Sequence, residues 1–358
     1  MNNFKHIAKH TVRHTVRHII TGLLAAAGLV TGGAWAQAPG AAPIEVNIGY
    51  TTADHVTLYV AQELGLYEKL GLKPKFFPFP SGAPLLAGLK SGSLDVVTAG
   101  LGLAFAIGNK TPLTILYVNS NDATGEGLVV NKDSPIRSFH DIAKAKKIGA
   151  ASGTCAQVAL YLMAQKVGID YAKLDIVNLP APLLRNSFLS NSIDAGIAWS
   201  PYTAMLDAEG FKVVSWDPEY TPGGVCPRMT GARPEFLQRY PEVGVKLVEL
   251  EAMAADAVAK NPQLAIDALV KRLSLTPAVA KAAVERVYLQ RPTLSDQLDP
   301  KSSHSMVSAD AGLVGKLYLA MQVLQATKTI PEPVPIEAIR QAVDPQYLKK
   351  FAASRRTN

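Results

Sequence analysis

The chain has 358 residues, of which 48% are hydrophobic and 18% are charged, and its formal net charge is +7. This is ordinary globular composition, with enough apolar surface for one or two cores. The basic residues are scattered and form no block interleaved with aromatic residues, which argues against a nucleic-acid-binding surface.

The first 36 residues have the layout of a secretory signal peptide. Basic residues lie between Lys5 and Arg17 without any acid, a largely apolar run extends from Ile19 to Val30, and Ala34-Trp35-Ala36 is a small-x-small cleavage site. The apolar run is shorter than the ~20 residues that span a membrane. We expect residues 1–36 to be removed on export to the periplasm; a retained N-terminal anchor is the alternative. Because four basic residues leave with this segment, the remaining chain has a net charge of +3.

After Pro43, strand-like and helix-like segments alternate along the chain. In a first series, strands are expected at 44–51, 73–79, 93–99 and 113–119, and helices at 58–72, 84–92 and 103–109. In a second series, helices are expected at 138–146, 154–168, 181–191 and 201–210, and strands at 147–152, 173–179, 193–200 and 211–216. After Pro227 the pattern is helical.

Alternating strands and helices predict an α/β fold with largely parallel sheets. We expect two lobes, each a mainly parallel sheet flanked by helices, followed by a helical C-terminal third. The first lobe would contain 44–130 and 228–345, and the second lobe 131–227. The chain would then cross between the lobes near 127–132 and near 223–230. A ligand cleft is expected between the lobes, because α/β sheets bind ligands at the carboxyl ends of their strands.

Two glycine-containing segments approach nucleotide-binding motifs without completing them. Gly100–Phe105, with Asp122 about 20 residues on, has Phe105 where a dinucleotide fingerprint needs its third glycine. Gly102–Thr111 departs from a phosphate-binding loop because Asn109 separates the glycine from the lysine. The histidines after the signal peptide, which are His55, His140 and His304, form no triad or zinc motif. The sequence therefore predicts no catalytic residue, metal or cofactor.

Four turns join a predicted strand to a predicted helix and are candidates for the cleft. They are Ser81–Ala83, Gly100–Gly102, Thr154–Cys155 and Trp199–Pro201. A helix N-terminus presents unpaired N–H groups and about half a positive charge, so several of them together can hold an oxyanion without any chemistry.

The two cysteines, Cys155 and Cys226, are far apart in the sequence. In an oxidising compartment an even number of cysteines suggests a disulfide. Two separate buried thiols are the alternative, and the sequence leaves both open.

From Ile44 to about Ile330 the sequence resembles the periplasmic solute-binding proteins of ABC importers for taurine, aliphatic sulfonates and nitrate. The resemblance rests on "IGYTTADHVTLYVAQELGLYEKLGL", "FPSGAPLLAGLKSGSLDVVTAG", "GEGLVVNKDSPIRSFHDIAKAKKIG", "LDIVNLPAPLLRNSFLSNSIDAGIAWSPY" and "RPEFLQRYPEV". It implies a two-lobe receptor of the type II-like periplasmic binding protein fold. Such a receptor closes at a hinge and delivers its solute to a membrane permease with a cytoplasmic ATPase.

By position, the resemblance implies a set of cleft residues. They are Thr52, Ala53, Asp54, His55, Ser81, Gly82, Ala83, Gly100, Leu101, Gly102, Glu126, Thr154, Cys155 and Trp199. Ser81 and Thr154 would supply hydroxyl groups, and Trp199 an apolar wall. Glu126 would accept from a cationic amine or pair with a nearby Lys or Arg.

Two departures from the family pattern bear on the solute. Relatives that bind taurine tend to have hydroxyl side chains after the equivalent of Gly100, where this chain has Leu101 and Gly102. Arg228 stands near the position where amine-binding relatives are expected to have an acid. An added cation would favour a second anionic group on the solute and disfavour an ammonium group.

The expected function is thus a non-enzymatic, monomeric receptor for a small organic anion of the taurine and alkanesulfonate class, with an ABC permease as its partner. The alternatives are a receptor for an aromatic or dicarboxylic acid, a receptor for a thiamine-precursor-like pyrimidine, and an enzyme that uses the same cleft.

Overall fold

A computed structural model describes residues 42–221 and 224–356. The predicted signal peptide, residues 1–36, lies outside the described residues. Within the described ranges, no helix combines the length and the apolarity that crossing a membrane requires.

The first lobe is built on a five-stranded sheet in the order β2-β1-β3-β10-β4. Its strands are β1 (Ile44–Thr51), β2 (Leu72–Phe79), β3 (Val96–Ala99), β4 (Thr114–Asn121) and β10 (Pro227–Ala232). Strand β1 alternates as the sequence predicts, with Val46 and Ile48 buried and Glu45 exposed. It pairs in parallel with both β2 and β3, so Ile48 lies opposite Phe76 and Val96.

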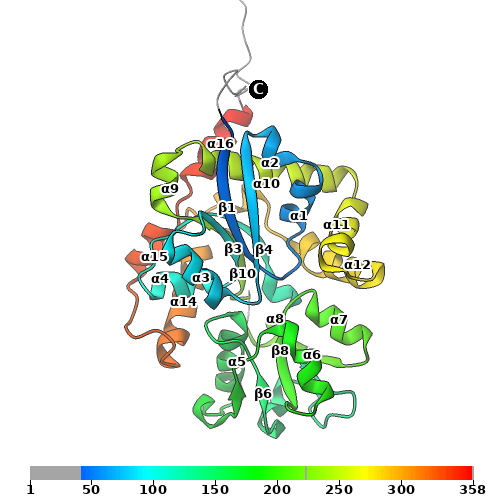
Figure 1. The fold of residues 1–358 in the computed structure, drawn as a ribbon. Helices are drawn as coiled ribbons and strands as arrows, with labels where there is room; N and C mark the ends of the chain where they lie inside the picture. The colour runs from blue at the N-terminus through cyan, green and yellow to red at the C-terminus, as the bar shows by residue number, and fades with distance from the viewer. Residues whose placement is uncertain (1–41, 222–223, 357–358) are drawn as a thin grey trace, which may run out of the picture. The chain divides into compact units, whose positions relative to one another are not determined.

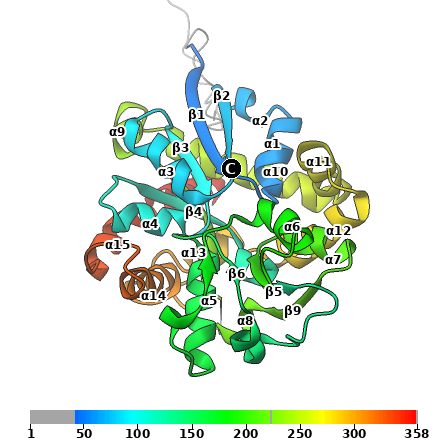
Figure 2. The same ribbon diagram turned by 60° about the horizontal axis from the view of Figure 1, so that its bottom comes forward.

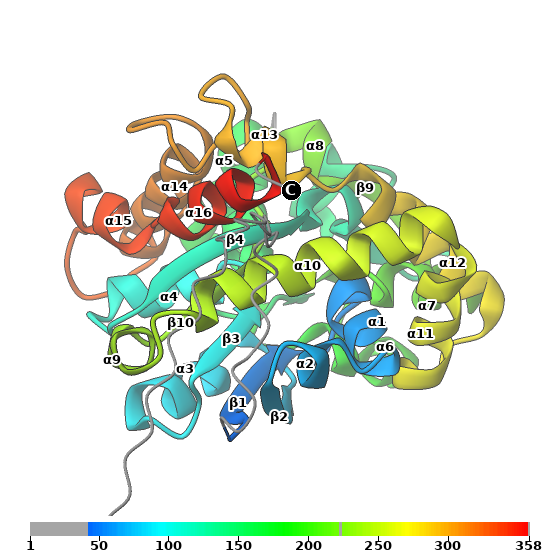
Figure 3. The ribbon, with the colours of Figure 1, turned by 90° about the horizontal axis from the view of Figure 1, so that it is seen from above.

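Helices pack around this sheet (Figure 1). Those between its strands are α1 (Val56–Glu63), α2 (Leu66–Lys69), α3 (Gly82–Ser91) and α4 (Gly102–Gly108). The C-terminal helices are α9 (Pro234–Arg239), α10 (Val243–Lys260), α11 (Gln263–Leu273), α12 (Pro277–Arg286), α13 (Leu294–Leu298), α14 (Gly312–Ala326), α15 (Ile336–Ala342) and α16 (Gln346–Arg356), with a 3-10 turn η4 (Tyr288–Gln290). Figure 3 shows α10 running across the sheet. The single helix expected at 58–72 is interrupted at Gly65, whose φ of 60° is left-handed.

The second lobe has a five-stranded sheet in the order β7-β6-β8-β5-β9. Its strands are β5 (Gly127–Val130), β6 (Ile148–Gly149), β7 (Ile176–Val177), β8 (Ala195–Ala198) and β9 (Lys212–Trp216). Its helices are α5 (Cys155–Lys166), α6 (Ala181–Leu189), α7 (Tyr202–Ala208) and α8 (Asp217–Tyr220), with 3-10 turns η1 (Asp122–Gly125), η2 (Phe139–Lys144) and η3 (Tyr171–Lys173). Helices α5 and α7 flank its strands in Figure 2.

Both sheets are mixed, because in each of them one strand runs against the other four. Strand β10 pairs antiparallel with β3 and β4, and β5 pairs antiparallel with β8 and β9. Both are crossing strands: β5 follows the passage from β4 through η1, and β10 follows the passage from β9 through α8.

Two details of the sequence interpretation change as a result. Residues 127–130, which we expected in the first lobe, form β5 and pair within the second sheet. Residues 227–232, where we expected a helical pattern to begin, form the buried strand β10 in the first sheet.

Each sheet has its own hydrophobic core. The first core joins strands β1, β3 and β4 to α1, α10 and α14, and the second surrounds β5, β8 and α6. Helix α5 contributes to both: Cys155 and Val158 belong to the first core, while Leu160 and Met163 belong to the second. The two cores therefore meet at the N-terminal end of α5.

Candidate functional site

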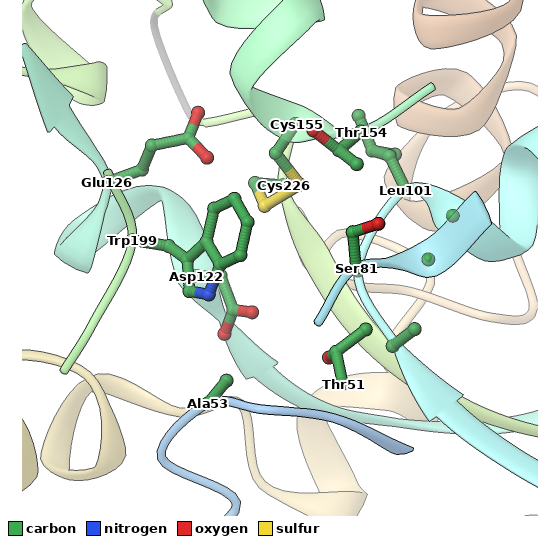
Figure 4. Close-up of a pocket in the computed structure, with 14 residues that line it drawn as sticks. Thr51, Ala53, Ser81, Leu101, Asp122, Glu126, Thr154, Cys155, Trp199 and Cys226 are labelled. Carbon is green, nitrogen blue, oxygen red and sulfur yellow. A yellow bond between two sulfur atoms is a disulfide. The ribbon is translucent and has the colours of Figure 1, made fainter. Parts of the chain in front are cut away.

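A pocket of about 410 Å³, its mouth included, lies between strand ends of the two sheets (Figure 4). Its lining residues are Thr51, Ala53, Ser81, Gly82, Ala99, Gly100, Leu101, Gly102, Asp122, Glu126, Thr154, Cys155, Trp199 and Cys226. Ten of the residues expected in the cleft are among them.

Three helices begin at this pocket. Ser81, Leu101 and Thr154 are the N-cap residues of α3, α4 and α5, and none of their side chains accepts a hydrogen bond from the helix that follows. The Thr154 hydroxyl donates instead to the Ala151 carbonyl at 2.7 Å. No capping side chain therefore occupies the first-turn N–H groups, although the Leu103 N–H of α4 donates to the Gly100 carbonyl at 3.1 Å. The positive ends of the helix dipoles also lie here.

Glycines allow two of these helix starts to touch each other. A Cβ atom on Gly82 would lie 2.7 Å from the Cα of Gly102, and one on Gly102 would lie 2.8 Å from the Cα of Gly82. Backbone therefore packs directly on backbone, which no other residue type permits at this distance. This explains why glycine stands in both turns.

Gly82→Ala should lower the free energy of unfolding by about 1–3 kcal/mol, the usual cost of an overpacked site, because the new methyl group meets backbone that cannot rotate away. Urea unfolding measures this as a lower midpoint at an unchanged m-value. The matched control is Gly88→Ala in the same helix, where the nearest atom is the tip of the Leu94 side chain at 2.7 Å. An equal loss in the two variants would contradict the argument from backbone contact.

Trp199 and Leu101 form apolar walls of the pocket. Trp199 is 9% exposed and Leu101 is 1% exposed. The Trp199 Nε1 atom donates to the Thr52 carbonyl at 3.4 Å, so the ring reaches from the second lobe to the first. Thr52 therefore contacts the pocket wall through its backbone, without lining the pocket itself.

Glu126 is the unusual group of the site. It is fully buried, and neither of its carboxylate oxygens has a hydrogen-bond partner among the described residues. Burial raises its pKa well above the ordinary value, and the nearby charges of Asp217 and Asp122 raise it further. A buried carboxyl without a partner is costly, so this position favours a proton, or a ligand that donates to it.

Arg228 does not serve as a free cation of the cleft, contrary to our expectation. It is 3% exposed and does not line the pocket. Its Nη2 atom donates to Asp54 Oδ1 at 2.6 Å and its Nε atom to Asp122 Oδ2 at 2.9 Å. Its Nη1 atom donates to the Asp54 carbonyl at 2.8 Å. The guanidinium is thus shared between the two buried carboxylates of Asp54 and Asp122.

Asp54, His55 and Ala83 also lie outside the pocket lining. Asp54 is buried, and its carboxylate accepts from Arg228 and from the Ser200 hydroxyl. Burial raises the pKa of Asp54 to about 6, against the lowering effect of Arg228. The buried ring of His55 contacts the Thr51 carbonyl at 2.7 Å, and burial holds its pKa well below the ordinary value. Ala83 is exposed on α3.

Four lining residues were absent from the set that we expected to bind ligand: Thr51, Ala99, Asp122 and Cys226. Asp122 directly follows the end of β4, and strand ends are where α/β sheets bind ligands, so this position was open to prediction. Cys226 carried no comparable signal, since strand β10 after it was itself not predicted.

Cys155 and Cys226 form a disulfide, with their Cα atoms 5.5 Å apart. One carboxylate oxygen of Glu126 lies within 4.8 Å of both sulfur atoms. Because the sulfurs are bonded to each other, neither offers the thiolate that a metal ion would need. Glu126 and the disulfide thus stand beside each other in the pocket wall (Figure 4).

The chain is similar to several proteins that are described as binding proteins. A "Putative binding protein" of Brucella abortus (strain 2308) is 27% identical over 243 residues, which are 66% of this chain and 73% of that protein. A "Putative ABC transporter periplasmic binding protein" of Brachyspira hyodysenteriae is 26% identical over 42% of this chain and 47% of that protein. The structure of the alkanesulfonate-binding protein SsuA from Xanthomonas axonopodis pv. citri, bound to MOPS, superposes with a TM-score of 0.69. That comparison covers 84% of this chain and 99% of SsuA at 19% identity.

The two mixed sheets, each flanked by helices, have the fold of the periplasmic binding proteins. The family model described as "NMT1/THI5 like" matches residues 52–265, which are more than half of the chain and include most of the pocket residues. The chain therefore belongs to the NMT1/THI5-like family.

Proposed function

We propose that this chain is an exported, solute-binding receptor of an ABC importer, and that it captures a small organic acid of the sulfonate class between its two lobes. The convergence of three uncapped helix N-termini, those of α3, α4 and α5, carries the proposal. Their N–H groups and dipoles can hold a sulfonate or carboxylate group without any counter-charged side chain. The names of the Brachyspira and Xanthomonas relatives support the class of protein and the class of ligand.

Glu126 adds a second requirement for the solute. Asp122 and Glu126 both line the pocket, and the guanidinium that contacts Asp122, that of Arg228, is already shared between Asp54 and Asp122. A solute with two acidic arms would place its second charge near these carboxylates. A solute with one acidic group and a protonated nitrogen would instead supply the partner that Glu126 lacks. An amino-sulfonate such as taurine has this pattern.

A second candidate is a receptor for an aminopyrimidine. Glu126 and the Trp199 wall favour it, because a cationic ring would stack on the indole and donate to the carboxylate. This ligand would make no use of the helix N-termini, so it ranks second. Neither candidate involves a catalytic step.

A thermal-shift panel distinguishes these solutes. We expect taurine to raise the unfolding temperature more than ethanesulfonate, succinate or an aminopyrimidine. At 100 times its dissociation constant a ligand adds about 2.7 kcal/mol, which is worth roughly 5 °C for a chain of this size. A response to the pyrimidine alone would favour the second candidate, and no response to any acid would contradict the proposal.

Glu126→Gln tests whether Glu126 recognises the amine of the solute. Because the amide cannot pair with an ammonium group as a charge, taurine should bind at least tenfold more weakly to the variant. Ethanesulfonate, which has no amine, should bind the variant as well as the natural chain. Isothermal titration of both ligands into both proteins measures this, and equal losses for the two ligands would show that Glu126 does not recognise the amine.

A further inference from the structure

The Cys155–Cys226 disulfide joins parts of the chain that belong to different lobes. Cys155 is the first residue of α5, which packs against the second sheet. Cys226 directly precedes β10, the strand by which the chain re-enters the first sheet. The lobes are already connected by two crossings of the chain, so the disulfide is a third covalent connection.

Non-covalent contacts hold the same end of α5 against the first lobe. The Gln157 side chain donates to the hydroxyls of Thr329 at 2.7 Å and Thr327 at 3.1 Å, which follow α14. Gly153, just before α5, lies so close to the Phe105 ring of α4 that a Cβ atom would be 3.2 Å from it. The first turns of α5 thus have covalent, polar and apolar attachments to the first lobe.

Gly100, which directly follows strand β3, also packs against the disulfide. A Cβ atom on Gly100 would lie 3.1 Å from the Cys155 sulfur and 3.6 Å from the Cys226 sulfur. Both cysteines and Gly100 line the pocket. Helix α5 of the second lobe, the end of β3 in the first lobe and the second crossing therefore meet at this bond.

The opposite wall of the pocket has no such connection among the described residues. There the second lobe reaches the first through non-covalent contacts alone among the described residues. Helix α7 packs against α12. Trp199 Nε1 donates to the Thr52 carbonyl at 3.4 Å, and the Ser200 hydroxyl donates to Asp54 at 2.8 Å. Hydrogen bonds of this kind break and re-form during domain motion, whereas a disulfide does not under oxidising conditions.

We propose that the Cys155–Cys226 disulfide is a strap that limits how far the two lobes separate, by keeping the N-terminus of α5 at the second crossing. The receptor then opens by movement of the side of the pocket that Trp199 lines, while the side at the N-terminus of α5 stays in place. With the disulfide intact, the solute-free receptor keeps the part of the pocket wall at the N-terminus of α5 assembled. With the disulfide reduced, the two lobes separate further. The strap acts on the lobes whatever solute is bound.

Distance measurements between spin labels test the strap without any ligand. One label pair, Lys90→Cys on α3 and Asn186→Cys on α6, reports on the two lobes, and both positions are exposed. The control pair, Lys90→Cys and Gln325→Cys, lies within the first lobe. The chain has only two natural cysteines, so labels attach to the introduced ones while the disulfide is intact.

With the disulfide intact, we expect a narrow distance distribution for the pair on different lobes. In the Cys155→Ser/Cys226→Ser background this distribution should broaden toward longer distances, while the control pair stays unchanged. Identical distributions for the pair on different lobes in the two backgrounds would overturn the proposal.

Reduction of the unlabelled natural chain by a water-soluble phosphine provides a second measurement that needs no substitution. The phosphine takes the oxygen of one water molecule to become a phosphine oxide, and the disulfide accepts two electrons and two protons to become two thiols. Small-angle X-ray scattering should then show a larger radius of gyration in the reduced chain, and an unchanged radius would overturn the strap. Because neither experiment contains a solute, their failure would leave the proposed function untouched.

Discussion

Arg228→Met should be among the most destabilising single substitutions in this protein, lowering the free energy of unfolding by about 3–5 kcal/mol. The guanidinium is 3% exposed and holds Asp54 and Asp122, which are also buried, with three hydrogen bonds. Methionine keeps much of the side-chain volume but leaves both carboxylates without their cation. Urea unfolding at pH 7.5 measures the loss.

Two control variants distinguish the cost of unpaired charge from the cost of altered packing. Lys73→Met removes a cation whose partner Glu45 is exposed, and it should cost no more than about 1 kcal/mol. The triple variant Asp54→Asn/Asp122→Asn/Arg228→Met leaves no carboxylate unpaired, so it should recover part of the loss. If the triple variant is less stable than Arg228→Met, the cost comes from packing rather than from unpaired charge.

The loss in Arg228→Met should also depend on pH. The pKa of Asp54 is already raised to about 6 in the folded protein, above its ordinary value near 4, and removing the cation should raise it further. A folded state with a raised pKa binds protons that the unfolded state releases, so its stability increases as the pH falls through the folded pKa. We therefore expect the difference between the variant and the natural chain to shrink between pH 8 and pH 5.

Removing the disulfide should have the second large effect. In the chain-entropy model, a cross-link between residues 71 apart contributes about 4 kcal/mol by restricting the unfolded chain. The Cys155→Ser/Cys226→Ser variant should therefore unfold at a lower urea concentration by the equivalent of that amount. Reduction of the natural chain should give a similar loss, since the cross-link is absent in both cases. A loss below about 1 kcal/mol in both would show that the unfolded chain is little restricted by this bond.

Local patterns predicted most of the elements in this fold, because their signals lie within a few neighbouring residues. Strand β1 was expected at 44–51 and is found at Ile44–Thr51, where the buried Val46 and Ile48 alternate with the more exposed Glu45 and Asn47. A helix was expected at 138–146, and a 3-10 helix begins there at Phe139, with the Ser138 hydroxyl accepting from the His140 N–H. The helix expected at 154–168 is found at Cys155–Lys166, and Gly168 beyond it has the left-handed φ of 75° typical of a residue that follows a helix.

The crossing strands were the elements most difficult to predict. Strand β10, with the sequence Pro227-Arg228-Met229-Thr230-Gly231-Ala232, contains a proline, an arginine and a glycine, which are unusual in the middle of a sheet. It forms because it is enclosed between β3 and β4, which are more than 100 residues earlier in the chain. Such pairing leaves no periodic signal in its own segment.

The site shows the same division between local and distant contacts. Ser81, Gly100, Thr154 and Trp199 were expected together because each follows a strand, and strand ends share one edge of a sheet. The partners of Arg228 are 174 and 106 residues away, so the sequence showed a cation but not that its charge was already balanced. Because the carboxylate partners of Arg228 could not be seen in the sequence, we expected a second acidic group on the solute.

The contact between Gly82 and Gly102 limits how this pocket can change in evolution or by design. Any side chain at either position would push the first turns of α3 and α4 apart, so both positions are restricted to glycine. New solute preferences must arise instead at neighbours whose side chains face the same space, such as Ser81, Leu101 and Trp199. A library aimed at altered specificity should vary those three positions and leave both glycines unchanged.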